Sequence, residues 1–159
     1  EVFSDLLLFA VYSGLRQQEL LRLKPEHIDI EKRVITVLSE RFQTTKSRKT
    51  RWVDLHKRLI PIVKKYSEQE FIFLNPNTNK KYAPKTVSEV FKNITRTLEL
   101  PETVNFKSLR STYAIRLLEA GANLKYISYQ LGHSSLLVTE NHYAKYIKNK
   151  FYGEIDLIQ

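Results

Sequence analysis

The 159-residue chain contains no cysteine and no methionine, and it has only four glycines and one tryptophan. Without cysteine, disulfides, thiolate zinc sites and thiol nucleophiles are excluded. Because a complete translated chain begins with methionine, we expect Glu1 to be an internal residue of a longer protein. No apolar run approaches the about 18–20 residues that a membrane span requires, and no charged-then-apolar leader is seen. These absences favour a cytosolic-type protein that does not act in a membrane.

What the chain has in excess is positive charge. Lysine and arginine number 26 against 17 aspartates and glutamates, and 26 − 17 gives a formal net charge of +9. Such an excess favours a polyanionic partner, with nucleic acid ahead of an anionic membrane. The hydrophobic content of 42% and the charged content of 27% are ordinary for a folded protein, and the length suits one domain.

The spacing of apolar residues predicts a mainly α-helical domain with a small antiparallel β-sheet (α+β), spanning 1–159. Gly14 and Gly132 are expected to end helices, and Pro25 excludes its predecessor from the helical region. The β-branched residues from Val34 to Val37 favour a strand. We expect helices at 2–11, 17–24, 56–66, 84–98, 106–120, 124–131 and 136–152. We expect strands at 33–38, 42–46 and 50–55, and a short buried extended run at 71–74 before a turn at 75–79.

The first group of candidate residues follows Gly14. Arg16 opens a helix, and Glu19 lies one turn later on the same face, where it can fix the guanidinium. A guanidinium held in this way binds phosphate in a bidentate manner. Taken alone, the segment is better explained as a capped helix start with a surface ion pair.

Two further segments place polar residues at helix boundaries. Lys107 and Arg110 are three residues apart and share a helix face, which taken alone also fits a solvated basic surface. His133 lies in a reversal after Gly132, and Tyr143 lies on the following helix. Histidine exchanges protons near neutral pH, and a tyrosine can act as a nucleophile beside cations. A capping histidine and a core tyrosine are the alternative explanation.

Read together, these segments resemble the catalytic domain of the tyrosine recombinases, the phage integrase family. The resemblance is carried in order by Gly14-Leu15-Arg16-x-x-Glu19-Leu20, Thr45-Lys46, Arg51-Trp52-Val53-Asp54-Leu55, Lys107-x-x-Arg110, Leu131-Gly132-His133 and Tyr143. It spans almost the whole chain. Lys107 departs from the family pattern, which usually has histidine there, and Asp54 replaces a frequent proline.

The resemblance implies a DNA breaking-rejoining fold and cleavage of double-stranded DNA through a 3′-phosphotyrosine, without metal or cofactor. It implies that Tyr143 is the nucleophile, that Arg16 and Arg110 bind the phosphate, and that Lys46 is the general acid. His133 would contact the phosphate and assist proton transfer, and Glu19 would support Arg16. Lys107 is carried over as a phosphate contact, because lysine is a poor general base unless its pKa is strongly lowered.

Other expectations concern partners. We expect an upstream DNA-binding domain outside this chain, self-association as a dimer or tetramer on DNA, and a cytoplasmic, nucleoid-associated location in a prokaryote or its mobile element. The apolar tail, 144–159, would pack on its own domain or dock on a neighbouring protomer. Each of the basic residues expected to contact the flanking DNA backbone is equally a plain solubilising charge. They are Arg41, Arg48, Lys49, Arg51, Lys80, Lys81 and Lys85.

Two other functions stay open at this point. A type IB topoisomerase uses similar residues but rejoins the same strand, and a catalytically silent DNA-binding accessory domain would keep the fold without the reaction. Tyr146 is an alternative nucleophile to Tyr143.

Overall fold

Two groups of elements make up the fold, and the computed structural model describes residues 1–38 and 50–150. Contacts are dense within Glu1–Tyr113 and within Ala114–Gln159, which form two compact units. Helix α5 begins in the first unit and continues into the second. Whether the chain acts as a single catalytic domain stays a prediction.

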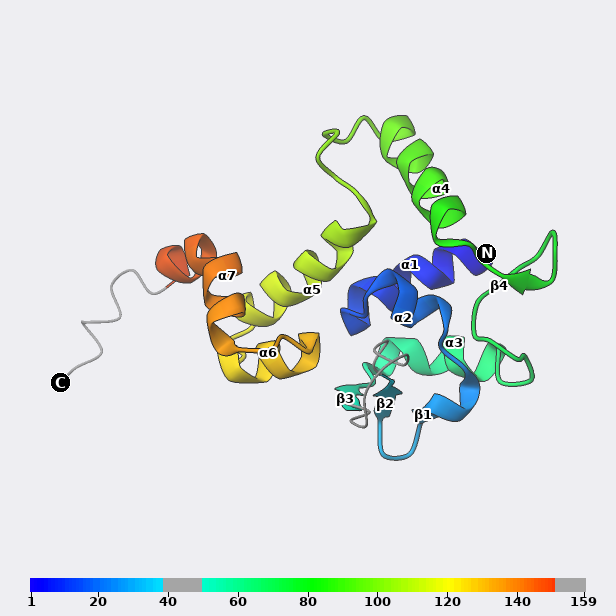
Figure 1. The fold of residues 1–159 in the computed structure, drawn as a ribbon, viewed down its shortest axis with the longest axis horizontal. Helices are drawn as coiled ribbons and strands as arrows, with labels where there is room; N and C mark the ends of the chain where they lie inside the picture. The colour runs from blue at the N-terminus through cyan, green and yellow to red at the C-terminus, as the bar shows by residue number, and fades with distance from the viewer. Residues whose placement is uncertain (39–49, 151–159) are drawn as a thin grey trace, which may run out of the picture. The chain divides into compact units, whose positions relative to one another are not determined.

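The first unit combines helices with two small antiparallel sheets (Figure 1). Its sheets have the orders β1-β2-β3 and β4-β5. Its elements are α1 (Val2–Ser13), α2 (Gln17–Leu21), the 3-10 helix η1 (Pro25–His27), β1 (Ile28–Asp29), β2 (Val34–Val37), β3 (Arg51–Asp54), the 3-10 helix η2 (Lys57–Leu59), α3 (Ile60–Lys65), β4 (Leu74–Asn75), β5 (Lys80–Lys81), α4 (Pro84–Thr97) and the start of α5 (Phe106–Glu119). The expected mainly helical fold with a small antiparallel sheet is confirmed.

One hydrophobic core joins the helices to the three-stranded sheet. Leu6 and Phe9 of α1 are fully buried, as are Ile35 of β2 and Val53 of β3. Ile35 and Val53 are register partners, so they point to the same face of the sheet. The sheet is therefore fixed against α1, and residues at its ends and at the ends of the helices are held in place.

Helix α4 shows how far the amphipathic pattern predicts packing. Pro84 occupies the first turn as expected, and Val87 and Phe91 are buried at helical spacing. Leu98, which was predicted on the same buried face, is instead 62% exposed because the helix ends at Thr97.

The second unit contains α6 (Leu124–Leu131) and α7 (Leu136–Lys150) together with the rest of α5. Asn123 caps α6 by accepting a hydrogen bond from the Lys125 amide, and Gly132 ends it in the left-handed region at φ 64°. In the described part of the chain, no helix is long and apolar enough to cross a bilayer.

Candidate active site

Arg16 lies at the reversal between α1 and α2. Gly14 ends α1 with φ 63°, and Arg16 is the extended residue that precedes α2. The Arg16 amide donates to Oε2 of Glu19 at 2.7 Å, and its Nη1 donates to Oε1 at 3.0 Å. The predicted support of Arg16 by Glu19 is therefore present, and the Arg16 side chain keeps 47% of its surface exposed.

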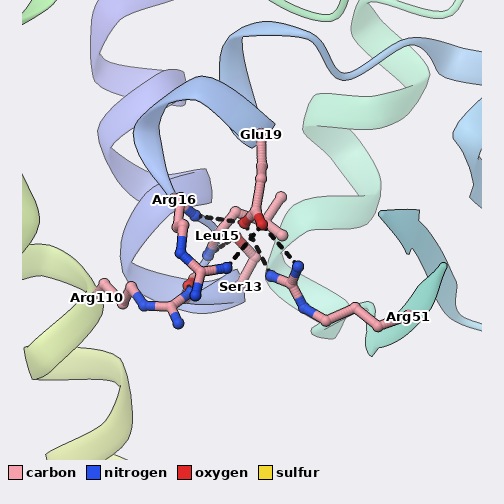
Figure 2. A network of polar contacts seen from close by, with 7 residues as sticks. Ser13, Leu15, Arg16, Glu19, Arg51 and Arg110 are labelled. Carbon is pink, nitrogen blue, oxygen red and sulfur yellow. Dashed lines mark hydrogen bonds and ion pairs between the residues drawn. The ribbon is translucent and has the colours of Figure 1, made fainter. Parts of the chain in front are cut away.

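Glu19 is held by a second arginine as well. Arg51 of β3 donates from Nη1 to Oε1 at 2.7 Å and from Nη2 to Oε2 at 2.8 Å, as Figure 2 shows. The Glu19 side chain is only 6% exposed. Burial raises the pKa of Glu19, but hydrogen bonds and charge from Arg51, with help from Arg16, outweigh burial and hold that pKa below its ordinary value. The charged carboxylate of Glu19 therefore holds two arginines, Arg16 at the start of α2 and Arg51 on β3.

Arg110 reaches the same turn from α5. Its Nη1 donates to the Gly14 carbonyl oxygen at 2.7 Å, and the residue is 9% exposed. Asn105 starts α5 by accepting from the Lys107 amide at 3.0 Å, which places Lys107 and Arg110 on the first turns of a 14-residue helix. The helix N-terminus adds positive potential near both side chains.

Arg16, Lys107 and Arg110 line one pocket of about 320 Å³. Arg16 comes from the turn before α2, and the other two come from α5. Three cationic side chains beside a helix N-terminus can bind an oxyanion such as a phosphate group. All three residues belong to the first unit, so the structure brings together three of the predicted catalytic residues.

The turn that carries the pocket depends on a close contact. A Cβ atom added at Gly14 would lie 2.4 Å from Cδ1 of Tyr113. Burial and the nearby charge of Asp54 raise the pKa of Tyr113 to about 12, although Arg110 opposes them. The Tyr113 phenol therefore stays neutral and packs against the turn.

The predicted histidine and tyrosine belong to the second unit. Nδ1 of His133 and Oγ1 of Thr139 are hydrogen-bonded at 2.7 Å, and Thr139 is fully buried. Tyr143 is 3% exposed on α7, and its ring meets the ring of His142 edge-on at 5.6 Å. Tyr146, the alternative nucleophile, is 50% exposed.

Comparison with known proteins decides the family. The phage integrase family model matches residues 4–150, which include the Arg16, Lys107–Arg110, His133 and Tyr143 positions. The chain belongs to the phage integrase family. A tyrosine recombinase from Thermosipho africanus is 34% identical over 80% of this chain and 44% of its own length. The tyrosine recombinase XerA of Pyrococcus furiosus is 31% identical over 80% of this chain and 45% of its own length.

Solved structures of integrases and recombinases share the fold. XerH bound to a palindromic difH substrate superposes with a TM-score of 0.74 at 20% identity, covering 96% of this chain and 44% of that one. The Tn1549 transposon integrase in complex with transposon right-end DNA gives a TM-score of 0.71 at 22% identity, covering 93% and 57%. The chain thus spans about half the length of the integrase-family proteins it matches.

Among the described residues of this integrase-family chain, those predicted to contact flanking DNA do not line the pocket described above. Lys46, Arg41, Arg48 and Lys49 fall outside the described residues. Lys80 and Lys81 are exposed on β5, and Lys85 of α4 is 87% exposed with its Nζ 3.8 Å from Oε1 of Glu89. Among the described residues, no three histidine, aspartate or glutamate side chains gather as metal ligands.

The sequence missed three residues that shape the integrase-family site. Arg51 was expected on flanking DNA, yet its guanidinium binds Glu19. Thr139 was not singled out, although a hydroxyl six residues after His133 could have been considered as its partner. Gly14 was given only a role in ending a helix, because its contact with Tyr113 is between residues far apart in sequence.

Proposed function

We propose that this chain is the catalytic part of a site-specific DNA recombinase or integrase, which cleaves and rejoins strands through a 3′-phosphotyrosine. The observation that carries the proposal is the single pocket lined by Arg16, Lys107 and Arg110 in a chain of the phage integrase family. Phosphodiester cleavage needs cations positioned where negative charge develops. These three side chains come from the turn before α2 and from α5, which are linked by the hydrogen bond of Arg110 to the Gly14 carbonyl.

In the cleavage step, Tyr143 Oη attacks the phosphorus, and the bond from phosphorus to the 5′ oxygen breaks. Arg16 and Arg110 bind the non-bridging oxygens in the pentacoordinate transition state, and one such contact is commonly worth about 10²–10³ in rate. Lys46 gives a proton to the leaving 5′ oxygen. The product is a phosphodiester between the 3′ end of the DNA and Tyr143. A 5′-hydroxyl can therefore attack this phosphorus and release the tyrosine, and rejoining needs no external energy source.

His133 and Lys107 have further proposed roles. The Thr139 hydroxyl holds the ring of His133 through Nδ1, and we assign this histidine to contact with the phosphate and to proton exchange with Tyr143. Lys107 lines the pocket as a phosphate donor in the place where the family usually has histidine. The amine of Lys107 can donate a hydrogen bond to the phosphate as a histidine would. We do not propose that Lys107 acts as a base.

Double-stranded DNA is the proposed partner, in keeping with the +9 charge. Structural neighbours include a transposon integrase in complex with transposon DNA and XerH bound to a DNA substrate. We further propose self-association on DNA and a DNA-binding domain outside this chain, with a nucleoid-associated location. Exposed apolar side chains of the second unit support self-association: Tyr126, Tyr129, Leu136, Leu137, Val138 and Tyr146.

The other functions receive less support. Relatives of this chain are named as recombinases, which favours strand exchange over type IB topoisomerase activity. A silent accessory domain would not need Arg16, Lys107 and Arg110 around one pocket.

Trapping of a covalent complex tests the proposal. The intact protein is incubated with nicked suicide duplexes of randomised sequence, and protein joined to DNA is detected on a denaturing gel. The parent and Tyr146→Phe should form the adduct, and Tyr143→Phe should not. An adduct that survives Tyr143→Phe but not Tyr146→Phe would reassign the nucleophile, and no adduct with any protein would defeat the enzymatic function.

A further inference from the structure

A second basic cleft lies at the C-terminal end of α2, and it is distinct from the pocket of Arg16, Lys107 and Arg110. Its volume is about 350 Å³, and Arg22, Lys24, His27 and Lys81 line it around Phe71. Among the described residues that were predicted to contact flanking DNA, only Lys81 lines this cleft. All of these residues belong to the first unit.

Phe71 gathers two lysines that are far apart in the sequence. Lys24 Nζ lies 5.3 Å from the centre of its ring, and Lys81 Nζ lies 5.1 Å from it. Both distances are within the range of a cation–π interaction. The segment is anchored, because the Ile72 amide donates to the Leu23 carbonyl at 2.9 Å. The ring of Phe71 thus holds the ammonium groups of Lys24 and Lys81 close together in the lining of the cleft.

Negative charge in the cleft is already neutralised. Among the described residues, Glu19 is the one acid that lines it, and its two oxygens accept four hydrogen bonds from Arg16 and Arg51. Glu26 is nearby, with Oε1 3.9 Å from His27 Nε2, but its side chain is 72% exposed. The cleft therefore offers an excess of cations to any ligand.

His27 adds an oriented donor. Its Nδ1 accepts from the Lys24 amide at 3.3 Å, so a neutral ring carries its proton on Nε2. Nε2 can then donate to an oxyanion beside the two ammonium groups. The cleft combines a histidine donor, an arginine and two lysines, which is the chemistry of phosphate recognition.

We propose that this cleft binds a backbone phosphate of duplex DNA beside the phosphate that is cleaved. The inference rests on the proposed function. Glu19 lines the cleft and also binds Arg16, so the cleft and the pocket of Arg16 are linked through one carboxylate, and a phosphate near the cleaved one is the part of the duplex that the cleft would reach.

The test compares variants of equal charge on a non-specific duplex of about 30 base pairs. Lys24→Gln with Lys81→Gln removes two charges from the cleft, and Lys32→Gln with Lys64→Gln removes two exposed charges that do not line it. Affinity is measured as a function of salt for the intact protein. The cleft variant should weaken binding about eightfold at 0.1 M salt and lower the salt slope by about 1, because one phosphate contact contributes about 0.9 to that slope.

Equal losses in the two double variants, or an unchanged slope in the cleft variant, would overturn the proposal. A free phosphate ion as the ligand would also overturn it. In that case inorganic phosphate would bind the parent but not the cleft variant, and at constant ionic strength it would not weaken DNA binding by the parent. If the parent and the control variant do not bind duplex DNA either, the proposed function itself fails, and the two failures are thus distinguished.

Discussion

Arg51 binds both carboxylate oxygens of Glu19, with Nη1 2.7 Å from Oε1 and Nη2 2.8 Å from Oε2. The same carboxylate accepts from the amide and guanidinium of Arg16 (Figure 2). Strand β3 is therefore connected through one buried acid to an arginine of the phosphate pocket. For the proposed reaction, this arrangement predicts that Arg51 is a positioning residue that acts on the phosphate through Glu19 and Arg16.

Replacing Arg51 by lysine should slow cleavage without abolishing DNA binding. A lysine cannot bond both oxygens in the fixed fork of a guanidinium, and a hydrogen bond to a charged group is worth about 1.5–3 kcal/mol. We expect the single-turnover cleavage rate of Arg51→Lys to fall about 10- to 100-fold. If Arg51 acts through Arg16, the double variant Arg16→Lys with Arg51→Lys should be no slower than Arg16→Lys alone.

Arg33→Lys is the matched control for that experiment. Arg33 donates from Nε and Nη2 to the Leu55 carbonyl oxygen at 3.2 and 3.1 Å, next to β3 but away from Glu19. It should lose stability but not cleavage rate per folded molecule. Equal rate losses in Arg33→Lys and Arg51→Lys, or additive losses with Arg16→Lys, would contradict a positioning role.

Acid titration of stability should reveal the charge of Glu19. Its pKa in the folded state lies below the ordinary 4.5, so ionised Glu19 stabilises the fold above about pH 4.5. That contribution is lost as the pH falls through the folded pKa. Glu19→Gln should therefore be less stable than the parent at pH 7 by about 3 kcal/mol, since it leaves buried arginine charge uncompensated.

Urea unfolding of both proteins between pH 3 and pH 7 measures this difference. Asp5 also titrates below its ordinary pKa, because hydrogen bonds to Lys65 and Tyr66 outweigh its burial. It is common to both proteins, so its effect cancels in the difference. The gap should narrow as the pH falls below about 4.5, and a gap that is constant over the whole range would show that Glu19 is not the titrating group.

The sequence predicted the long helices and the four-residue strands β2 and β3, but it did not predict the two-residue strands. Helices at 84–98 and 124–131 appear as α4 and α6 because their ends carry Pro84 and Gly132. Strands β1, β4 and β5 have two residues each, too few to show a period. Helix α2 ends at Leu21 rather than at residue 24, since the Leu23 carbonyl pairs with the distant Ile72 amide instead of continuing the helix.

In the candidate site, too, contacts between residues close in sequence could be predicted and contacts between distant residues could not. Arg16 and Glu19 are three residues apart, so helical spacing alone was enough to pair them. The contact of Arg51 with Glu19 spans 32 positions and depends on how β3 packs. Tertiary contacts of this kind leave no periodic trace in one sequence, and the structure was required to show them.

Gly14→Ala should destabilise the protein and misplace Arg110. The residue has φ 63°, which costs an L-residue about 1–2 kcal/mol, and its new Cβ would also clash with the ring of Tyr113. Because Arg110 Nη1 binds the Gly14 carbonyl, a shift of this turn moves the guanidinium. We expect a lower melting temperature and a cleavage rate reduced at least tenfold.

Gly121→Ala separates the two effects. Gly121 has φ 88°, but a Cβ there would meet no atom within 4 Å. It should show the backbone strain alone, with a smaller loss of stability and no change in the cleavage rate of folded protein. Similar rate losses in the two variants would mean that the contact with Tyr113 does not position Arg110.

Thr139→Val should disturb His133 while keeping the packing of α7. Valine has the shape of threonine without its hydroxyl, so the bond of 2.7 Å to Nδ1 is lost and the ring is no longer held by this partner. Thr139→Ser keeps the hydroxyl. We expect Thr139→Val to cleave DNA about tenfold more slowly and to change the pH profile of cleavage between pH 5 and 8, where histidine titrates, whereas Thr139→Ser stays near the parent.

Thr95→Val controls for the loss of a buried hydroxyl. Thr95 is 5% exposed and its Oγ1 donates to the Lys92 carbonyl at 3.0 Å within α4. It should lower stability without altering the pH profile. If Thr139→Val and Thr95→Val give the same profile as the parent, His133 does not depend on Thr139, and a rate loss in Thr139→Val would then report unfolding alone.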